Sequence, residues 1–227
     1  MRALTLLGLL TLAGCGGATA GAPAFPDAGR PVASVVSSRW STEPERDRRR
    51  EAAAVIAAAG VRTGMTVADI GAGEGYYTIR LAAAVGIKGR VLAEDIMPAY
   101  RDALARRVAH DRLDNVSVKL GRPDDPMLPP GSFDRIFMIH MYHEIAQPYA
   151  FLWHLRPALK EGGRVVVVDA NRETYAHGTP PARLACELAA VGYAQVERRE
   201  MPEAGGYLAL FEARGPRPDP GTMRPCR

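Results

Sequence analysis

The sequence has 227 residues, of which 47% are hydrophobic, and a formal net charge of +4. This length is enough for one α/β domain with a sizeable core. The basic residues are scattered, and the only run, Arg46 to Arg50, is interleaved with acids and is typical of a solvated helix face. A nucleic-acid partner is therefore not expected. Contact of this run with an anionic membrane is the alternative.

The N-terminus has the features of an export signal. Arg2 gives a positive start, and residues 4–12 form an apolar run about half as long as a membrane-spanning helix. The stretch Leu12-Ala13-Gly14-Cys15 resembles the lipobox of bacterial lipoproteins. That resemblance implies a signal peptide at 1–14, lipidation of Cys15, and a lipid-anchored protein outside the cytosol, on the periplasmic or outer-membrane side. An ordinary secretory signal and a miscalled start codon, which would leave a cytosolic protein, are the alternatives.

Two further segments differ in composition from the central domain, which we place at 41–214. Residues 15–40 are rich in Gly, Ala, Pro and Ser and are predicted to form a flexible tether. The Pro- and Arg-rich residues 215–227 are predicted to be disordered. Cys186 lies in an apolar helical pattern and Cys226 in this tail. A disulfide between them is possible in an oxidising compartment, but their spacing does not require it.

Apolar periodicity predicts strands that alternate with helices. Alternation of this kind indicates a mostly parallel sheet with helices on both faces, and the last two strands, joined by a short turn, make one strand antiparallel. The chain is thus predicted to have a Rossmann-like α/β fold with seven strands. The predicted helices are 41–59, 76–85, one that starts at 98, 149–159 (ended by Gly162-Gly163) and 181–191. The predicted strands are 66–70, 90–96, 116–120, 133–139, 164–169, 195–201 and 207–213.

The stretch 66–75 organises this fold around a ligand. A buried strand ends at Asp69-Ile70, and a glycine turn of the form G-x-G-x-G then opens a helix. Glycines let backbone N–H groups approach a ligand closely at a helix N-terminus. The dinucleotide fingerprint has the spacing G-x-G-x-x-G instead. With Asp69 two residues before Gly71, the stretch resembles motif I of the class I S-adenosylmethionine-dependent methyltransferases.

Three later segments resemble the same family in the same order: Leu92 to Ile96, Leu120 to Asp134, and Leu159 to Arg164. The resemblance covers roughly residues 43–214. It implies S-adenosylmethionine as cofactor and transfer of its methyl group to an acceptor, expected to be a small molecule. The family uses a cytosolic methyl donor, whereas the lipobox would export this chain. The sequence does not identify the acceptor or the oligomeric state.

An acid at the end of the second strand is expected to bind the cofactor ribose. Asp95 follows Gly75 by 20 residues, and alternation points it toward the crevice; Glu94 is the alternative. A carboxylate after the third strand would accept the adenine amino group. Asp69 would meet the cationic methionine end. The predicted cofactor residues are Asp69, Gly71, Gly73, Gly75, Asp95, Met97, Asp124 and Asp125.

The polar stretch after the fourth strand is the predicted acceptor side. His140, His143 and Glu144 lie where this strand reaches the crevice, and a histidine could remove a proton from a hydroxyl or thiol. Structural or substrate-contact roles are the alternative for all three. We expect no metal, because these residues lack the settled spacing of a three-ligand site. Tyr76, Tyr77 and Tyr142 are expected to add aromatic surface at the same mouth.

Two other functions remain open. The same fold could bind a small molecule at the membrane without methyl transfer. A nicotinamide-dependent oxidoreductase is disfavoured by the glycine spacing and by Asp69.

Overall fold

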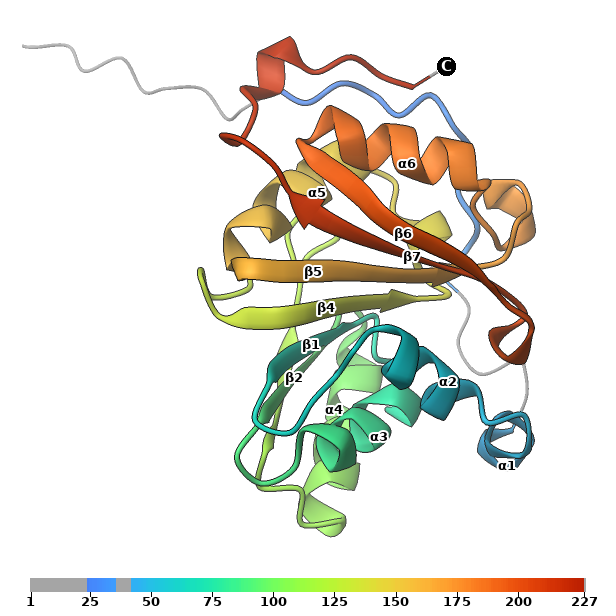
Figure 1. The fold of residues 1–227 in the computed structure, drawn as a ribbon, viewed down its shortest axis with the longest axis vertical. Helices are drawn as coiled ribbons and strands as arrows, with labels where there is room; N and C mark the ends of the chain where they lie inside the picture. Colours follow the sequence, from blue (N-terminus) through green and yellow to red (C-terminus); the bar gives the residue numbers. More distant parts are fainter. Residues whose placement is uncertain (1–23, 36–41, 227) are drawn as a thin grey trace, which may run out of the picture.

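The computed structural model describes residues 24–35 and 42–226. Seven strands form one sheet in the order β3-β2-β1-β4-β5-β7-β6, and this sheet is twisted (Figure 1). All neighbouring pairs are parallel except those of β7, which is antiparallel to both β5 and β6. The predicted fold class is confirmed. The strands are β1 (Thr66–Ile70), β2 (Arg90–Asp95), β3 (Val116–Leu120), β4 (Phe133–Ile139), β5 (Leu159–Asp169), β6 (Tyr193–Met201) and β7 (Gly206–Ala213).

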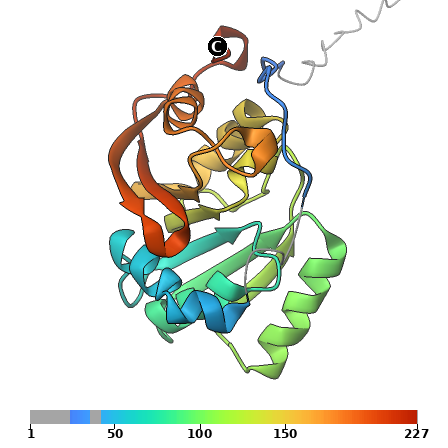
Figure 2. The same cartoon turned by 90° about the vertical axis from the view of Figure 1, so that its right-hand side faces the viewer.

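Helices cover both faces of the sheet (Figures 1 and 2). Along β5, Val165 and Val167 pack with α5 and α6, whereas Val166 and Val168 pack with α2 and α3. All four valines are fully buried, because a strand at the centre of a sheet with helices on both faces is covered on both sides. The helices are α1 (Glu43–Arg48), α2 (Glu51–Ala58), α3 (Tyr76–Val85), α4 (Pro98–His110), α5 (Pro148–Leu155) and α6 (Pro181–Ala190). In the part of the chain that the structure describes, none of them is long and apolar enough to span a membrane.

Short 3-10 helices lie at the connections. They are η1 (Tyr142–Glu144), η2 (Arg156–Ala158), η3 (Thr174–Ala176), η4 (Pro202–Ala204) and η5 (Pro220–Thr222). Two of them, η1 after β4 and η3 after β5, contact each other at the carboxyl edge of the sheet. The connections after β4 and β5 therefore bring chemistry-bearing residues that are distant in sequence to one place.

Two helix boundaries were predicted wrongly. The single helix predicted at 41–59 is broken into α1 and α2 by Arg50, whose φ is +58°. The helix predicted at 149–159 ends at Leu155, because Pro157 has no backbone N–H with which to continue it. Consequently β5 starts at Leu159, and Gly162-Gly163 lie inside the strand rather than at a helix end. A Cβ on Gly163 would lie 2.7 Å from the Phe133 carbonyl oxygen, so only glycine fits this irregular pairing.

The prediction of a disordered tail was also wrong. The chain from Gly215 to Cys226 packs on the domain, with Met223 only 5% exposed. Trp153 Nε1 donates to the Pro218 carbonyl oxygen at 2.9 Å. A disulfide joins Cys226 to Cys186 on α6. Composition predicted disorder because it takes no account of these specific contacts.

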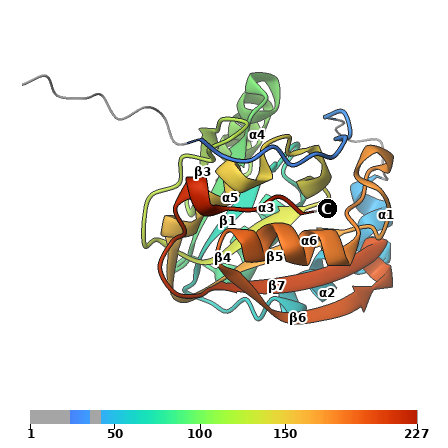
Figure 3. The same cartoon turned by 90° about the horizontal axis from the view of Figure 1, so that it is seen from above.

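The part of the predicted tether that the structure describes packs on the domain. Residues 24–35 lie over the layer of α5 and α6 together with the C-terminal tail (Figure 3). Ala28 and Ala33 are buried, and Arg30 Nε donates to the buried Glu187 Oε1 at 2.9 Å. This ion pair joins the segment to α6 and gives the buried Glu187 carboxylate a cationic partner. The remaining tether positions and Cys15 lie outside the described residues.

Candidate active site

A cavity of about 680 Å³ opens at the carboxyl ends of β1 and β4. Its walls come from α1 and the start of α2, from the glycine loop after β1, and from the turns after β4 and β5. The lining includes Asp69, Gly71, Gly73, Tyr77, His140 and His177. Ligands of open α/β sheets bind at this edge, so this cavity is the candidate active site.

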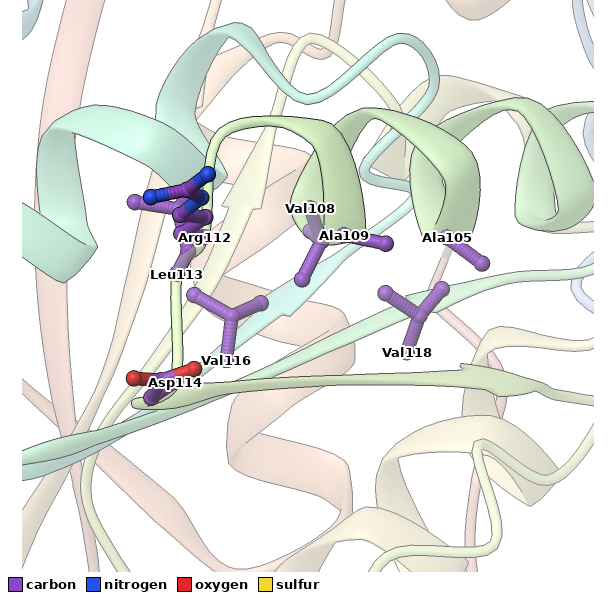
Figure 4. Close-up of a pocket in the computed structure, with 8 residues that line it drawn as sticks. All are labelled: Ala105, Val108, Ala109, Arg112, Leu113, Asp114, Val116 and Val118. Atoms are coloured by element: carbon purple, nitrogen blue, oxygen red, sulfur yellow. The ribbon is translucent and has the colours of Figure 1, made fainter.

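A second cavity, shown in Figure 4, lies between the C-terminal half of α4 and the start of β3. Its walls are mostly apolar, with Val108, Val116 and Val118 among them. It lies at the opposite end of the strands from the glycine loop. We assign no chemistry to it.

The three glycines of the loop have different tasks. All have positive φ: +66° at Gly71, +54° at Gly73 and +88° at Gly75. A Cβ on Gly75 would lie 2.3 Å from Leu104 Cδ1, so Gly75 lets α4 pack against the start of α3. A Cβ on Gly73 would meet nothing within 4 Å. Gly73 therefore forms an open cradle in which a ligand can approach the backbone, while Gly75 serves packing.

The two acids at the end of β2 occupy different environments. Asp95 Oδ2 accepts the Gly73 N–H at 2.9 Å, and Oδ1 accepts the Met97 N–H at 2.8 Å, so Asp95 fixes the loop. Glu94 is 1% exposed, and its Oε1 has no hydrogen-bond partner among the described residues. Burial, followed by the nearby Asp95 carboxylate, raises the pKa of Glu94 to about 8. The unpartnered oxygen and the open Gly73 cradle are features that a nucleoside-containing cofactor with hydroxyl donors would fit.

Asp69 lies at the end of β1 against the first turn of α3. It is 3% exposed, and its Oδ2 accepts the Thr78 hydroxyl at 2.6 Å. Burial raises the pKa of Asp69 to about 6, although the Thr78 hydrogen bond acts in the opposite direction. As a lining residue, it can face the cationic end of a ligand, as the sequence analysis expected.

Of the predicted cofactor residues, only Asp69, Gly71 and Gly73 line the cavity, and Gly75, Asp95, Met97, Asp124 and Asp125 do not. Met97 is 39% exposed beyond β2. The Asp124 side chain is exposed, and its carbonyl oxygen lies 2.9 Å from His154 Nδ1. Asp125 Oδ1 accepts the Met127 N–H at 2.7 Å and so stabilises its own turn. Neither aspartate is therefore brought to the glycine loop by a direct contact.

An ionic network holds α1 over the glycine loop. Arg107 on α4 donates to Glu43 Oε1 at 2.6 Å and to the Glu74 carbonyl oxygen at 2.8 Å. The same arginine lowers the pKa of Glu43. The Arg46 guanidinium packs on the Tyr76 ring, 3.7 Å from its centroid, and donates to Glu51 Oε1. These residues were not assigned to the site from the sequence, because the contacts of Arg46 with Tyr76 and of Arg107 with Glu43 join α1 to positions 30 and 64 residues away.

The predicted catalytic residues separate in space. His140, with a φ of +55°, lines the cavity at the end of β4, and burial lowers its pKa. His143 is 1% exposed and does not line the cavity. Its Nδ1 lies 3.0 and 3.1 Å from the two oxygens of Asp169, which is fully buried at the end of β5. Glu144 Oε1 lies 4.0 Å from His143 Nε2.

Two residues of this region, Asp169 and His177, were not predicted from the sequence, and Tyr142 was misplaced. The available signal for Asp169 was its position at the ligand-binding end of the most β-branched strand. His177 follows η3 and offers no sequence pattern. Tyr76 and Tyr77 line the cavity as expected, but Tyr142 is fully buried and donates its hydroxyl to Glu187 Oε2.

Comparisons with known proteins agree with this geometry. A family model described as a methyltransferase domain matches residues 67–163. A ubiquinone/menaquinone biosynthesis C-methyltransferase from a Marinomonas species is 26% identical over 181 residues, which are 74% of this chain and 66% of that protein. A demethylmenaquinone methyltransferase from Symbiobacterium thermophilum is 30% identical over 112 residues, which are 49% of this chain and 45% of that protein.

The chain spans about half the length of several of the curated relatives it matches. Among solved structures, a SAM dependent methyltransferase from Aquifex aeolicus superposes with a TM-score of 0.64 at 24% identity. The match covers 75% of this chain and 97% of that one. This likeness shows the fold.

Proposed function

We propose, on the premise that residues 67–163 form a methyltransferase domain whose relatives imply S-adenosylmethionine as cofactor, that this chain methylates a small-molecule acceptor. The observation that carries the proposal is the fixed glycine loop. Asp95 holds the Gly73 amide, and Gly73 is open toward the cavity. Because the loop is already ordered before the cofactor binds, it holds the cofactor in one orientation, and binding does not cost the conformational entropy of ordering the loop.

The residues that would hold the cofactor lie along the carboxyl edge of β1 and β2. Backbone groups of Gly71 and Gly73 would approach it, Asp69 would face its cationic end, and Asp95 or Glu94 would accept ribose hydroxyls. The buried, unpartnered Glu94 Oε1 supports the second assignment. Bound there, S-adenosylmethionine supplies an electrophilic methyl group on a sulfonium.

The protein's own contribution is orientation, exclusion of water and handling of the acceptor's proton. The α1 helix closes the cavity over the loop through the contacts of Arg107 and Arg46. His140 lines the same cavity, and its burial favours the neutral imidazole, which can accept a proton. His140 is therefore the residue we propose as base for a hydroxyl or thiol acceptor.

A small acceptor is favoured by the size and composition of the cavity. Its volume of about 680 Å³ lies within the range of roughly 300–1,000 Å³ that is usual for small-molecule sites. Aromatic surface from Tyr76 and Tyr77 lies beside polar groups from His140 and Asp69. Several relatives are named as quinone-pathway methyltransferases, so quinols and phenols are the first acceptors to examine.

Two measurements test the proposal. Calorimetry with S-adenosylmethionine and S-adenosylhomocysteine should show binding of both. A mass-spectrometric screen over quinols, phenols, thiols and amines should then detect, for one class of acceptor, a product heavier than that acceptor by roughly 14 mass units, the mass of one CH2 group. Binding without any product would favour the non-catalytic binding module. If neither compound binds, the proposed function is wrong.

We also propose that the domain works outside the cytosol, anchored through Cys15. The disulfide between Cys186 and Cys226 supports export, because disulfides persist mainly in oxidising compartments. An exported enzyme needs a supply of the methyl donor there. Methyl transfer in that compartment therefore requires that S-adenosylmethionine is delivered to it.

A further inference from the structure

Three potential metal ligands converge beside the cavity from two distant segments. His143 and Glu144 lie on η1, and His177 directly follows η3. One ligand atom from each of the three residues lies within 4.8 Å of the others. The His143 and His177 rings meet edge to face, with centroids 5.4 Å apart. Residues 33 positions apart in sequence thus present two imidazoles and one carboxylate to a single point.

The orientation of His143 is fixed from behind. The Asp169 carboxylate can only accept, so His143 Nδ1 carries the proton that it donates to Asp169. Asp169 is itself held by the Ala170 N–H at 2.9 Å and the Thr179 hydroxyl at 2.7 Å. In the neutral ring the other nitrogen, Nε2, is then the one whose lone pair can bind a metal ion. It is buried and has no hydrogen-bond partner among the described residues.

A carboxylate that orients one histidine nitrogen while the other points at further ligands is the arrangement found behind metal-bound histidines. A buried, unpartnered imidazole nitrogen is otherwise costly. Two imidazoles and one carboxylate suit first-row transition metals, whereas Mg²⁺ and Ca²⁺ prefer oxygen ligands alone. We propose that His143, Glu144 and His177 bind a divalent transition-metal ion, Zn²⁺ by preference, with Asp169 as the positioning residue.

The site would need a small contraction when the ion binds. Zn²⁺ takes histidine nitrogen and carboxylate oxygen at about 2.0–2.2 Å, which places ligand atoms roughly 3.5 Å apart. The present His143 Nε2 to Glu144 Oε1 distance is 4.0 Å. Glu144 lies on the three-residue helix η1 and its side chain is 14% exposed. Binding would draw the three ligand atoms together from their present separations of up to 4.8 Å.

The position of the ion at the cavity wall follows from His177, which lines the cavity. Three protein ligands leave a fourth coordination position open in a tetrahedral site. The ion would also link the turns after β4 and β5, whose 3-10 helices are in contact. No metal was expected from the sequence, because His140, His143 and Glu144 alone lack the spacing of a three-ligand site and His177 is distant in sequence.

Metal binding is tested on the full chain without methyl donor or acceptor. The protein is stripped with a chelator and titrated with Zn²⁺, Co²⁺ or Mg²⁺ alone. We expect one equivalent of Zn²⁺ by mass spectrometry of the metal content, and visible Co²⁺ absorption typical of four- or five-coordination. We expect no comparable binding of Mg²⁺.

The variants are chosen to keep the fold. His177→Asn removes the imidazole at a position with a φ of +56°, which asparagine tolerates, and Glu144→Gln removes the charge on η1. Each should weaken Zn²⁺ binding at least about tenfold, whereas His110→Ala, with a side chain 88% exposed, should not. Equal binding by the parent and His177→Asn, or a Co²⁺ spectrum unchanged from the hydrated ion, would overturn the proposal. Because no cofactor is present, these results are independent of methyl transfer.

Discussion

The Asp95 carboxylate joins the second strand of the sheet to the glycine loop, since its Oδ2 accepts the Gly73 N–H at 2.9 Å. An acid selected from the sequence as a ligand-binding group is therefore also the group that fixes the loop. Its second oxygen accepts the Met97 N–H at 2.8 Å. The loop geometry and the acid at the end of β2 must accordingly be tested together.

Replacing this acid should weaken cofactor binding. Asp95→Ala removes the Gly73 anchor and one ribose acceptor, and the expected loss is about 1.5–3 kcal/mol of binding free energy for S-adenosylhomocysteine. Isothermal titration calorimetry measures it. Asp102→Ala, an acid on α4 with a side chain 53% exposed, is the matched control. Unchanged affinity in Asp95→Ala would transfer the ribose role to Glu94.

Alanine in the glycine loop should separate binding from packing. Gly73→Ala places a Cβ in the open space that the cofactor would occupy, so it should abolish or weaken cofactor binding. Its positive φ should also lower the stability of the protein by about 1–2 kcal/mol. Gly75→Ala should cost more stability, because its Cβ would clash with Leu104.

The control for the backbone strain is Gly131→Ala, which has a φ of +59° and no atom within 4 Å of the added Cβ. It should lose stability as Gly73→Ala does but keep the parent's affinity for the cofactor. Denaturant titration and calorimetry together distinguish the three variants. Equal cofactor affinity in Gly73→Ala and Gly131→Ala would mean that the loop is not the binding site.

The elements that local chemistry defines were predictable from the sequence. The glycine loop, β1, α3 and β3 follow from patterns within ten to fifteen residues, and their bounds agree with the prediction. The break at Arg50 was not predictable, because a left-handed arginine has no sequence signature. The ordered tail depends on Trp153 and on the disulfide to α6, and composition carries no record of such long-range contacts.

The candidate site likewise has one part that the sequence predicts and one part that it does not. Gly71, Gly73 and Asp69 were found because they belong to one continuous motif that lines the cavity. The partnership of His143 with Asp169 joins the ends of two different strands, and only the strand order β4-β5 brings them together. A single sequence predicts that order only through the fold class.

Glu94 should make the protein less stable as the pH rises. Its pKa is raised from 4.5 to about 8 in the folded state. Between pH 4.5 and 8 the unfolded chain therefore releases this proton while the folded protein retains it, so the free energy of unfolding falls across that window. The loss should exceed about 1.4 kcal/mol, the value of one pKa unit.

Glu94→Gln removes this titration, and its free energy of unfolding should change less between pH 5 and 8 than the parent's. Glu161→Gln, at an exposed position on β5, should behave like the parent. Chemical denaturation at several pH values makes the comparison. If the parent and Glu94→Gln show parallel pH profiles, Glu94 is not the buried proton carrier that its environment indicates.

The disulfide should contribute substantially to stability. It closes a segment with a sequence separation of 40 residues and fastens the tail to α6. Loop-closure entropy gives an expected loss of about 2–4 kcal/mol for Cys226→Ser or for the reduced parent. Thermal unfolding with and without reductant measures the loss. Equal melting temperatures for the reduced and oxidised parent would contradict it.

The N-terminus provides the last prediction, which needs no knowledge of the substrate. Arg2, the apolar run 4–12 and Cys15 occur in the order that an exported lipoprotein requires. We expect the native protein to begin at Cys15 and to be heavier by its acyl groups, because several acyl chains are needed for stable anchoring. Mass spectrometry of the N-terminal peptide from isolated membranes tests this. Cys15→Ser should release the chain from membranes or leave it uncleaved, whereas Cys226→Ser should stay anchored. An unprocessed N-terminus in the soluble cytosolic fraction would rule out the anchor and would place the methyl donor and the domain in the same compartment.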